Sequence, residues 1–464
     1  MRHTILTCTT HEHLSMIKWG TTFGSHDGAL AVFVDDELVF ASDAERFSRK
    51  KNDPIIPDNL IEFAEENWGI PDEVYYYEDQ ECKNNRRRFA GQGPQEIRFK
   101  YPLRHCNHHL SHARYGYWTS PYVNCTVLVI DAIGEWDTLT KWKVRDGRFQ
   151  RLMNWCYPKS LGLFYSAMTQ SAGWKPNEEE YILMGASAVK KHKLENYNLV
   201  RGMWDENVNF HRGVELRMDT FEIASIAQQI YEEEFRKIVN EIDDDIVLVG
   251  GCALNVSANR FLTNAFIPPN PGDGGSAIGC VVSQKISPSP YIGYEIPGKY
   301  PVTEIIKELK ENGWVGVASG KAEFGPRALG NRSLLADPRV PGIKERLNEY
   351  KGREEFRPVA PMILKEDVSE YFFDGMPSPF MNTVRYAKKG GPWVHLDATS
   401  RLQEVSEEPH RTLLQEWKKE TGSSLLLNTS LNKRGTPMIN TKEDMKKEFK
   451  DEGGEQRKNA PHCL

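Results

Sequence analysis

Two short apolar runs, each ending in a turn, constrain the fold of this chain more than any other feature. Residues 126–131 (TVLVID) end in an acid before a glycine-containing turn, and residues 246–250 (IVLVG) lead directly into a pair of glycines. Continuous apolar runs of this length are typical of buried strands, and α/β sheets bind their ligands at the ends of such strands. The two runs therefore predict an α/β sheet with a ligand site at its strand ends.

Two further segments predict regular structure. Residues 28–34 and 37–42 are expected to form a hairpin joined by Asp35 and Asp36. From Phe221 to Ile242 the apolar residues recur at helical spacing, which predicts an amphipathic helix.

The domain boundary is expected in residues 286–303, where prolines and glycines are frequent. It would separate a first domain, residues 1–290, from a second one, residues 300–464, with strands of its own such as 424–427. The stretch 446–464 is polar and has little to bury, so we expect it to be frayed.

Composition narrows the class of protein. With 39% hydrophobic and 27% charged residues, the chain of 464 residues is typical of a globular protein. Its 59 basic and 65 acidic residues give a net charge of −6, which argues against general coating of nucleic acid. The eight cysteines include no C-x-x-C pair, and we find neither a membrane-spanning run nor a signal peptide. We therefore expect a cytoplasmic protein without a membrane partner.

A pair of histidines is the first candidate for chemistry. His108 and His112 are four residues apart, so on a helix both rings share one face and can hold a divalent metal. Two ligands are not a complete site, so a carboxylate from elsewhere is required. Asp273 lies in a loop of glycine and proline that can bring one carboxylate to a ligand. The alternatives are a histidine-rich helix start and an ordinary Asp-Gly turn.

Two glycine-bearing loops follow the apolar runs, one with Gly134 and Glu135 and one with Gly251 and Asn255. Backbone amides in such loops can cradle phosphate, although each loop alone is a weak signal. Neither loop has the spacing of a P-loop or of a dinucleotide-binding turn.

The second half of the chain is rich in cationic, amide and hydroxyl side chains. Planar guanidinium groups gathered with amides and hydroxyls suit the recognition of phosphate and carboxylate. Proline and glycine interrupt these runs, which favours an anion site over a solvated helix face. The candidate residues are Lys321, Arg327, Arg332, Lys351, Arg353, Arg357, Asn428, Ser430 and Arg434.

Taken together, these segments resemble the NodU/CmcH-type O-carbamoyltransferases over roughly residues 20–445. The most diagnostic element is the run from Phe324 to Arg339. The other matching segments include Ser25-His26-Asp27, Ala44 to Arg49, His108 to Ala113, Lys175 to Glu178, Gly251 to Asn255, Pro271 to Asp273 and Leu427 to Gly435.

The resemblance implies an α/β fold: an actin-like N-terminal domain of the ASKHA class, similar to tRNA-threonylcarbamoyl transferases, and a C-terminal YrdC-like domain with a twisted sheet. It implies that ATP and carbamoyl phosphate form a carbamoyl-adenylate in the second domain. The carbamoyl group would then move to an acceptor hydroxyl in the first. The cationic residues of the second half would neutralise phosphate charge as the leaving group forms.

The resemblance also implies roles for four residues. His108, His112 and Asp273 match the metal ligands of the family, with iron as the implied ion and magnesium as an option with ATP. His26 matches an active-site position and is expected to contact the adenylate phosphate or the acceptor, the alternative being a structural turn histidine.

The chain departs from the family pattern in three places. It has Ala132 where the family has glycine, and residues 1–20 have no assigned role. The tail after Lys446 does not resemble the closing strand of the family, so the second domain is expected to lack an edge or to end differently.

One segment bears on the acceptor. Between residues 83 and 104 a single acid, Glu96, stands among seven basic residues, a net charge of +6, with three aromatic residues between them. The basic residues are Lys83, Arg86, Arg87, Arg88, Arg98, Lys100 and Arg104. Such a segment beside a reactive centre suits a polyanion whose base is presented to the enzyme. We therefore expect a 5-hydroxymethylpyrimidine acceptor, such as 5-hydroxymethylcytosine, in DNA or a nucleotide.

Three alternatives stay open. The basic segment can be a solvated loop, in which case the acceptor is the hydroxyl of a small natural product, such as an antibiotic or a sugar. A non-catalytic protein that binds nucleotide or nucleic acid on the same scaffold is the second alternative. An actin-fold sugar kinase is the third, but it leaves the arginines of the second half unexplained.

Overall fold

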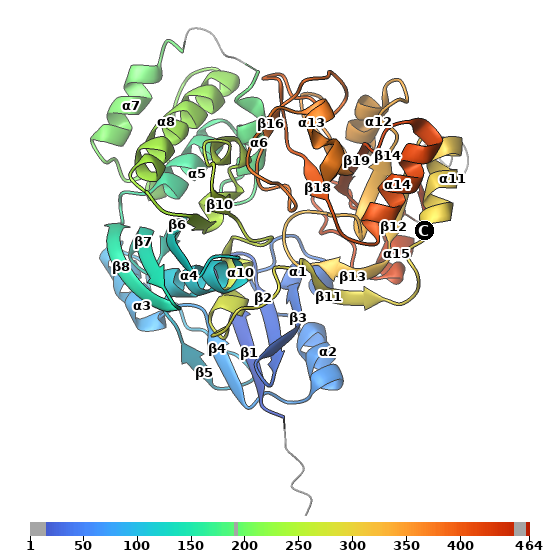
Figure 1. The fold of residues 1–464 in the computed structure, drawn as a ribbon. Coiled ribbons are helices and arrows are strands. Elements are labelled where there is room, and N and C mark those ends of the chain that lie inside the picture. Colours follow the sequence, from blue (N-terminus) through green and yellow to red (C-terminus); the bar gives the residue numbers. More distant parts are fainter. Residues whose placement is uncertain (1–14, 190–193, 450–460) are drawn as a thin grey trace, which may run out of the picture.

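Residues 15–189, 194–449 and 461–464 are described by the computed structural model of the chain (Figure 1). Two five-stranded sheets organise its N-terminal part, and a six-stranded sheet organises its C-terminal part. The described residues include no helix that is both long and apolar enough to cross a bilayer.

The first sheet has the order β3-β2-β1-β4-β5. Its strands are β1 (Ile17–Thr22), β2 (Ala29–Val34), β3 (Glu37–Asp43), β4 (Glu73–Tyr76) and β5 (Leu103–His105). Strands β1, β2 and β3 are antiparallel, while β4 and β5 run parallel to β1. The predicted hairpin is confirmed as β2 and β3, and both turn residues, Asp35 and Asp36, have the positive φ angles that tight hairpins favour.

The second sheet has the order β10-β9-β6-β7-β8. Its strands are β6 (Asn124–Gly134), β7 (Asp137–Arg145), β8 (Arg148–Cys156), β9 (Ile246–Val249) and β10 (Ala265–Phe266). Strands β6, β7 and β8 form an antiparallel meander, and β9 and β10 run parallel to β6. Both sheets therefore share one arrangement, which is that of an actin-like fold, and the predicted fold class is confirmed.

The two apolar runs are neighbours in this second sheet. Thr126 of β6 lies opposite Ile246 of β9, and the pairing continues in parallel to Val129 and Val249. The carboxyl ends of both runs therefore meet at one edge, as expected of strands that deliver a ligand site.

Two helices lie between the sheets. Helix α4 (His108–Thr119) packs on β6 and β9, whereas α10 (Asp273–Gly279) packs on β1, and the two helices contact each other. Glycine permits this close packing, because a Cβ atom at Gly20 would lie 1.8 Å from the carbonyl oxygen of Ala277, and one at Gly279 would lie 1.9 Å from that of Ser111.

The remaining helices of the N-terminal part lie around the two sheets, and α1 lies on the side of the C-terminal part (Figure 1). They are α1 (Ala44–Ser48), α2 (Asp58–Trp68), α3 (Gln80–Phe89), α5 (Leu161–Ser171), α6 (Glu180–Ala186), α7 (Tyr197–Asp205), α8 (Thr220–Asn240) and α9 (Val256–Asn259), with short 3-10 turns at Phe210–Arg212 and Gly251–Leu254. Helix α8 confirms the predicted amphipathic helix. The Asp219 side chain caps it by accepting from the amide of Glu222.

The C-terminal part is built on a mixed sheet of order β18-β15-β19-β14-β12-β20. Its strands are β12 (Trp314–Ala318), β14 (Arg332–Ala336), β15 (Ala360–Leu364), β18 (Gln403–Val405), β19 (Leu426–Ser430) and β20 (His462–Cys463). Two small pairs accompany it: β11 (Tyr291–Ile296) with β13 (Gly320–Glu323), and β16 (Arg385–Tyr386) with β17 (Thr399–Ser400). Its helices are α11 (Val302–Asn312), α12 (Ile343–Tyr350), α13 (Val368–Tyr371), α14 (His410–Thr421) and α15 (Lys442–Phe449), with a 3-10 turn at Lys365–Asp367.

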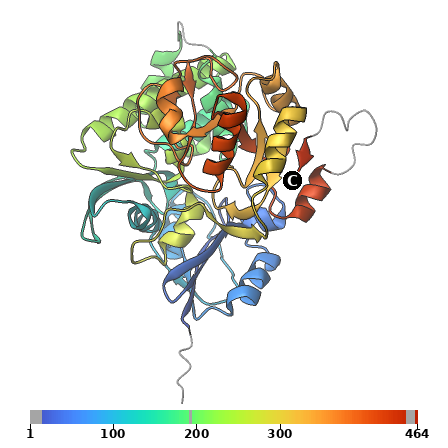
Figure 2. The ribbon, with the colours of Figure 1, turned by 45° about the vertical axis from the view of Figure 1, so that its right-hand side comes forward.

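The end of the chain corrects the expectation of a frayed tail and a missing edge. Helix α15 continues to Phe449, whose ring stacks on Tyr350, and β20 pairs in parallel with β12 (Figure 2). Leu464 packs against the core of the C-terminal part. The few apolar residues of this tail are enough to anchor it to the C-terminal part. They are too widely spaced in the sequence to form a periodic pattern. Residues 450–460 lie outside the described residues.

One short helix joins the two parts. Arg46 of α1 is fully buried and donates hydrogen bonds to the carbonyl oxygens of Glu323, Gly325 and Ile439. Arg49, which follows α1, donates to the carbonyl oxygen of Met438 at 2.6 Å. The predicted boundary between residues 290 and 300 stays a prediction, and contacts of this kind cross it.

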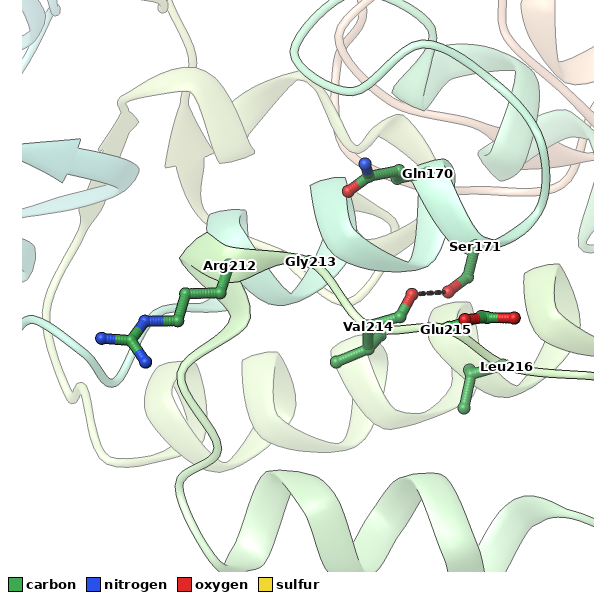
Figure 3. A pocket seen from close by; sticks show the side chains of 7 residues that line it. All are labelled: Gln170, Ser171, Arg212, Gly213, Val214, Glu215 and Leu216. Atoms are coloured by element: carbon green, nitrogen blue, oxygen red, sulfur yellow. Dashed lines mark hydrogen bonds between the residues drawn. The ribbon is translucent and has the colours of Figure 1, made fainter.

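A surface pocket lies at the C-terminal end of α5 (Figure 3). Gln170, Ser171 and the segment 212–216 line it, and the Ser171 hydroxyl donates a hydrogen bond to the carbonyl oxygen of Val214. None of the predicted metal or phosphate residues lines this pocket.

Candidate active site

Helix α4 begins at the first predicted metal ligand. Asn107 caps it by accepting a hydrogen bond from the amide of Leu110 at 2.9 Å, so His108 stands in the first turn and His112 one turn later. Both imidazoles are buried, and their Nε2 atoms are 3.2 Å apart. The two rings therefore lie on one face of the helix, as their spacing predicted.

Two carboxylates complete the cluster. Asp131, at the end of the first apolar run, places Oδ2 2.9 Å from Nε2 of His108. Asp273, the first residue of α10, places Oδ1 3.2 Å from Nε2 of His112. One ligand atom from each of these four buried residues lies within 4.8 Å of all the others. We call these residues, His108, His112, Asp131 and Asp273, the histidine–aspartate cluster.

The donor set of this cluster fits a divalent metal ion. Two imidazole nitrogens and two carboxylate oxygens point at one small buried volume, which is the ligand chemistry that iron, zinc and manganese accept. Although burial opposes protonation, the charge of Asp273 and the hydrogen bond to Asp131 raise the pKa of His108 well above its ordinary value. Converging negative charge of this kind favours a cation at the same point.

Sequence reasoning did not assign Asp131 as a ligand. In the sequence, Asp131 is recognisable only as the acid that ends an apolar run. In the structure, the backbone amide of Gly251 holds this carboxylate by donating a hydrogen bond to Oδ1 at 3.1 Å. Despite burial, the hydrogen bond and charge of His108 hold the pKa of Asp131 well below its ordinary value. The two predicted glycine loops thus meet at this carboxylate.

The residues predicted to cradle phosphate have structural partners. A Cβ atom at Gly134 would lie 2.2 Å from the His108 ring, so glycine is required there by close packing. Glu135 accepts hydrogen bonds from the amides of Asp79 at 2.7 Å and His108 at 3.1 Å. Asn255 caps α9 and exchanges hydrogen bonds with Gln228. Cofactor binding by these residues stays a prediction.

His26 lies in the bend after β1, and its Nδ1 is 3.1 Å from Oδ2 of Asp27. Burial opposes its protonation, but the hydrogen bond to Asp27 and the nearby negative charges together raise the pKa of the imidazole to about 10. The charges of Asp131 and Asp273 act in the same direction, so His26 presents a positive charge on the side of the histidine–aspartate cluster.

A second centre lies in the C-terminal part. Burial and the neighbouring Arg357 lower the pKa of Arg327 to about 10 and that of Arg353 to about 9. Nε of Arg327 and both Nε and Nη2 of Arg353 are buried without a hydrogen-bond partner among the described residues. Unsatisfied guanidinium donors crowded together are the signature of an anion site.

Arg401 also belongs to this centre, and sequence reasoning missed it. Burial, together with the charges of Arg327, Arg357 and Arg353, lowers its pKa well below the ordinary value. It stands alone in its segment of the sequence, without a motif, so only the folded chain brings it to the others. We call Arg327, Arg353, Arg357 and Arg401 the arginine group.

The other predicted anion ligands differ in their surroundings. Arg332 is fully buried, and its guanidinium donates to the carbonyl oxygens of Tyr294, Ser319 and Asn440 at 3.0 Å each. It therefore holds neighbouring segments together, and its predicted contact with an anion stays a prediction. The side chain of Lys321 is exposed on β13.

Lys351 and Ser430 hold the loop after β19. The Lys351 ammonium donates to the carbonyl oxygen of Asn432 at 2.7 Å, and the Ser430 hydroxyl donates to the Asn432 side chain at 2.6 Å. Asn428 keeps a buried Oδ1 without a partner among the described residues. Arg434 pairs with Glu354 at 3.0 Å.

The N-terminal part reaches this second centre through α6. Arg357 stacks over the ring of Tyr181 at 4.8 Å from its centroid, and Arg434 lies 3.5 Å from Glu179. Phe356 also packs edge-on against Phe221 of α8. The arginine group therefore lies where the two parts of the chain meet.

Comparison with known proteins identifies the family of the chain. The chain matches the family model for the carbamoyltransferase N-terminus over residues 86–233 and the model for the C-terminus over residues 306–456. It belongs to the carbamoyltransferase family. Within that family it is an O-carbamoyltransferase of the NodU/CmcH type, an enzyme that transfers carbamoyl groups.

Two relatives illustrate this assignment. The chain is 26% identical to the 3'-hydroxymethylcephem-O-carbamoyltransferase of Amycolatopsis lactamdurans, over 90% of this chain and 94% of the relative. It is 37% identical to nodulation protein U of Sinorhizobium fredii, over 41% of this chain and 40% of the relative.

Similarities to solved structures are weak. HypF of T. kodakarensis aligns over 57% of this chain and 46% of its own at 12% identity, with a TM-score of 0.30. A ROK hexokinase of Thermus thermophilus aligns over 57% of this chain and 98% of its own at 13% identity, with a TM-score of 0.27. The actin-like assignment rests on the strand order of the two five-stranded sheets.

Proposed function

We propose that this enzyme transfers the carbamoyl group of carbamoyl phosphate, through a carbamoyl-adenylate, to the hydroxyl of a 5-hydroxymethylpyrimidine such as 5-hydroxymethylcytosine in DNA or a nucleotide. The observation that carries the two-step route is the presence of two separate centres. The arginine group, with unsatisfied donors on Arg327 and Arg353, lies in the C-terminal part, and the buried histidine–aspartate cluster lies in the N-terminal part.

The arginine group suits the first step. Carbamoyl phosphate, ATP and water would yield carbamoyl-adenylate, pyrophosphate and phosphate, so negative charge accumulates on two leaving groups. Guanidinium donors that are already desolvated stabilise such charge without reorganising solvent. Arg327, Arg353 and Arg401 are the members on which we expect this step to depend most, because none of the three has a carboxylate ion-pair partner among the described residues, whereas Arg357 lies 3.4 Å from Glu354.

The histidine–aspartate cluster suits the second step. The acceptor oxygen would attack the carbamoyl carbon, the bond from that carbon to the adenylate oxygen would break, and AMP would leave. One of the cluster carboxylates would take the hydroxyl proton. Because the raised pKa of His26 favours the protonated imidazole, this residue suits the binding of the adenylate phosphate rather than the removal of a proton.

A divalent ion held by His108, His112, Asp131 and Asp273 would supply Lewis-acid activation of the acceptor hydroxyl. We expect iron, because two imidazoles with carboxylate are typical of non-heme iron sites. The chain's own contribution is to fix these ligands, through the cap of α4 and the amide of Gly251.

The acceptor assignment rests on the basic segment 83–104, of which only a part is available to a ligand. Lys100 pairs with Glu65 at 2.6 Å, Arg104 pairs with Glu73 at 2.7 Å, and Arg98 pairs with Glu96 at 3.1 Å. Lys83 is buried against Glu78. The remaining cations are on α3. The backbone amide of Asp79, the N-cap residue of this helix, donates a hydrogen bond to Glu135, which lies at the edge of the histidine–aspartate cluster.

A direct acceptor screen tests this proposal. The protein is incubated with ATP, carbamoyl phosphate and DNA that contains 5-hydroxymethylcytosine, and the digested nucleosides are analysed by mass spectrometry. We expect a carbamoyl mass shift on the modified nucleoside and AMP release that depends on carbamoyl phosphate, with unmodified cytosine DNA as the matched control. An unshifted nucleoside beside a carbamoylated sugar or aminoglycoside would assign the enzyme to small natural products instead.

A further inference from the structure

One arginine of α3 has no partner among the described residues. The Arg86 side chain is only 6% exposed, yet its guanidinium makes no hydrogen bond or ion pair with any residue that the structure describes, and its Nε is fully enclosed. Burial lowers the pKa of this guanidinium, and the charge of Glu78 only partly opposes that effect. A buried cation without a partner is costly, so its persistence calls for an anion that the bare chain does not supply.

The neighbouring cations do not share this property. Arg87 donates from Nε to the carbonyl oxygen of Gly93 at 2.8 Å, and Arg88 donates to the Asn85 side chain at 2.9 Å. Lys83 of the same helix and the basic residues that follow the helix are paired with acids, as described above. Within the basic segment, Arg86 is therefore the buried side chain for which the described residues supply neither a hydrogen bond nor an ion pair.

The surroundings of Arg86 are cationic and aromatic. Burial lowers the pKa of His211, and the positive charges of the nearby Arg86 and Arg87 lower it further. The His211 ring packs edge-on against Tyr157 at 6.0 Å, and the hydroxyl of Tyr157 accepts from Asn209 at 2.6 Å.

An aromatic pair stands beside this corner. Phe89, at the end of α3, is 72% exposed, and its ring lies 5.4 Å from that of Trp136. Trp136 directly follows Glu135, which holds the amide of His108. The pair therefore connects the surface of α3 to the histidine–aspartate cluster.

We propose that Arg86, flanked by Arg87, binds a phosphate of the acceptor, and that Phe89 and Trp136 give an adjacent base a face for stacking. The inference rests on the proposed nucleotide acceptor. A planar guanidinium suits bidentate contact with phosphate, and aromatic rings beside a cationic groove are how proteins hold unpaired nucleotides. A phosphate at Arg86 anchors the chain of nucleotides while the hydroxymethylated base reaches the cluster.

The test compares Arg86→Gln, Arg86→Lys and the control Arg148→Gln, whose exposed arginine lies at the start of β8. The probe is a fluorescent single-stranded oligonucleotide that contains 5-hydroxymethylcytosine. We expect Arg86→Gln to weaken binding about tenfold and to reduce the salt slope by about one, Arg86→Lys to recover part of the loss, and Arg148→Gln to bind like the wild type. Because Arg86→Gln removes a buried unpartnered charge, its melting temperature should equal or exceed that of the wild type.

Three results overturn the inference in distinguishable ways. If the wild type carbamoylates the oligonucleotide and Arg86→Gln does so with an unchanged KM, the phosphate subsite is wrong while the proposed acceptor stands. If the wild type leaves the oligonucleotide unmodified, the proposed acceptor fails, and the subsite fails with it. A lowered melting temperature with equal losses in the Gln and Lys variants would make Arg86 a structural residue.

Discussion

At the scale of single residues, each centre is assembled from side chains that lie far apart in the chain. His108, His112 and Asp273 come together as the resemblance implied, because helix geometry fixes the spacing of the first two. Asp131 and Arg401 join their centres only through contacts between distant segments, which no local pattern encodes. Arg332 carries the right charge in a diagnostic motif, but backbone carbonyls occupy it.

Removal of one imidazole tests the division of labour between the centres. His108→Ala should lose its bound divalent metal and carbamoyl transfer, because one of two nitrogen ligands is gone. It should still release pyrophosphate from ATP when carbamoyl phosphate is present, since the arginine group lies elsewhere. Metal content by mass spectrometry and the two product assays measure this. His462→Ala, at an exposed histidine, is the control, and transfer at the wild-type rate in His108→Ala would discard the metal role.

At the scale of elements, long periodic segments were predictable and short ones were not. Helix α8 and the β2–β3 hairpin appear where pattern and turn residues place them. Strand β20 is two residues long, and a pair of residues cannot show a period. It forms because its partner β12 offers an unpaired edge: the amide of Leu464 donates to Gly316, and Leu464 accepts from Ala318.

Deletion of this last strand should measure what the edge contributes. A chain that ends at residue 460 loses the pairing of β20 with β12, the two backbone hydrogen bonds of Leu464 and the burial of Leu464, together at least about 2–4 kcal/mol of unfolding free energy. We expect a clearly lower denaturant midpoint by circular dichroism. A four-residue extension of the same terminus serves as the control, and an unchanged midpoint in the deletion would mean that β20 does not stabilise the sheet.

At the scale of the whole molecule, the strand order of the two five-stranded sheets is enough to identify the duplicated actin-like architecture. The contacts that join the N-terminal and C-terminal parts could not be predicted from the sequence. The arginine group borders α6 from the N-terminal part, and the histidine–aspartate cluster lies between the two five-stranded sheets. In the proposed two-step route, the product of the arginine group would therefore form at the boundary of the part that consumes it.

The contacts of helix α1 affect how the chain unfolds. The guanidinium of Arg46 is buried and donates from both terminal nitrogens to carbonyl oxygens of the C-terminal part, so separating the two parts would leave these donors and acceptors without their partners. We expect a single cooperative calorimetric transition for the wild type and two resolved transitions for Arg46→Met, whereas the exposed control Lys50→Met should keep the single transition. Two transitions in the wild type would contradict this. The two centres would then unfold in one transition, so neither would stay folded without the other. In the proposed route, no partly folded enzyme would accumulate that could release activated carbamoyl groups into water.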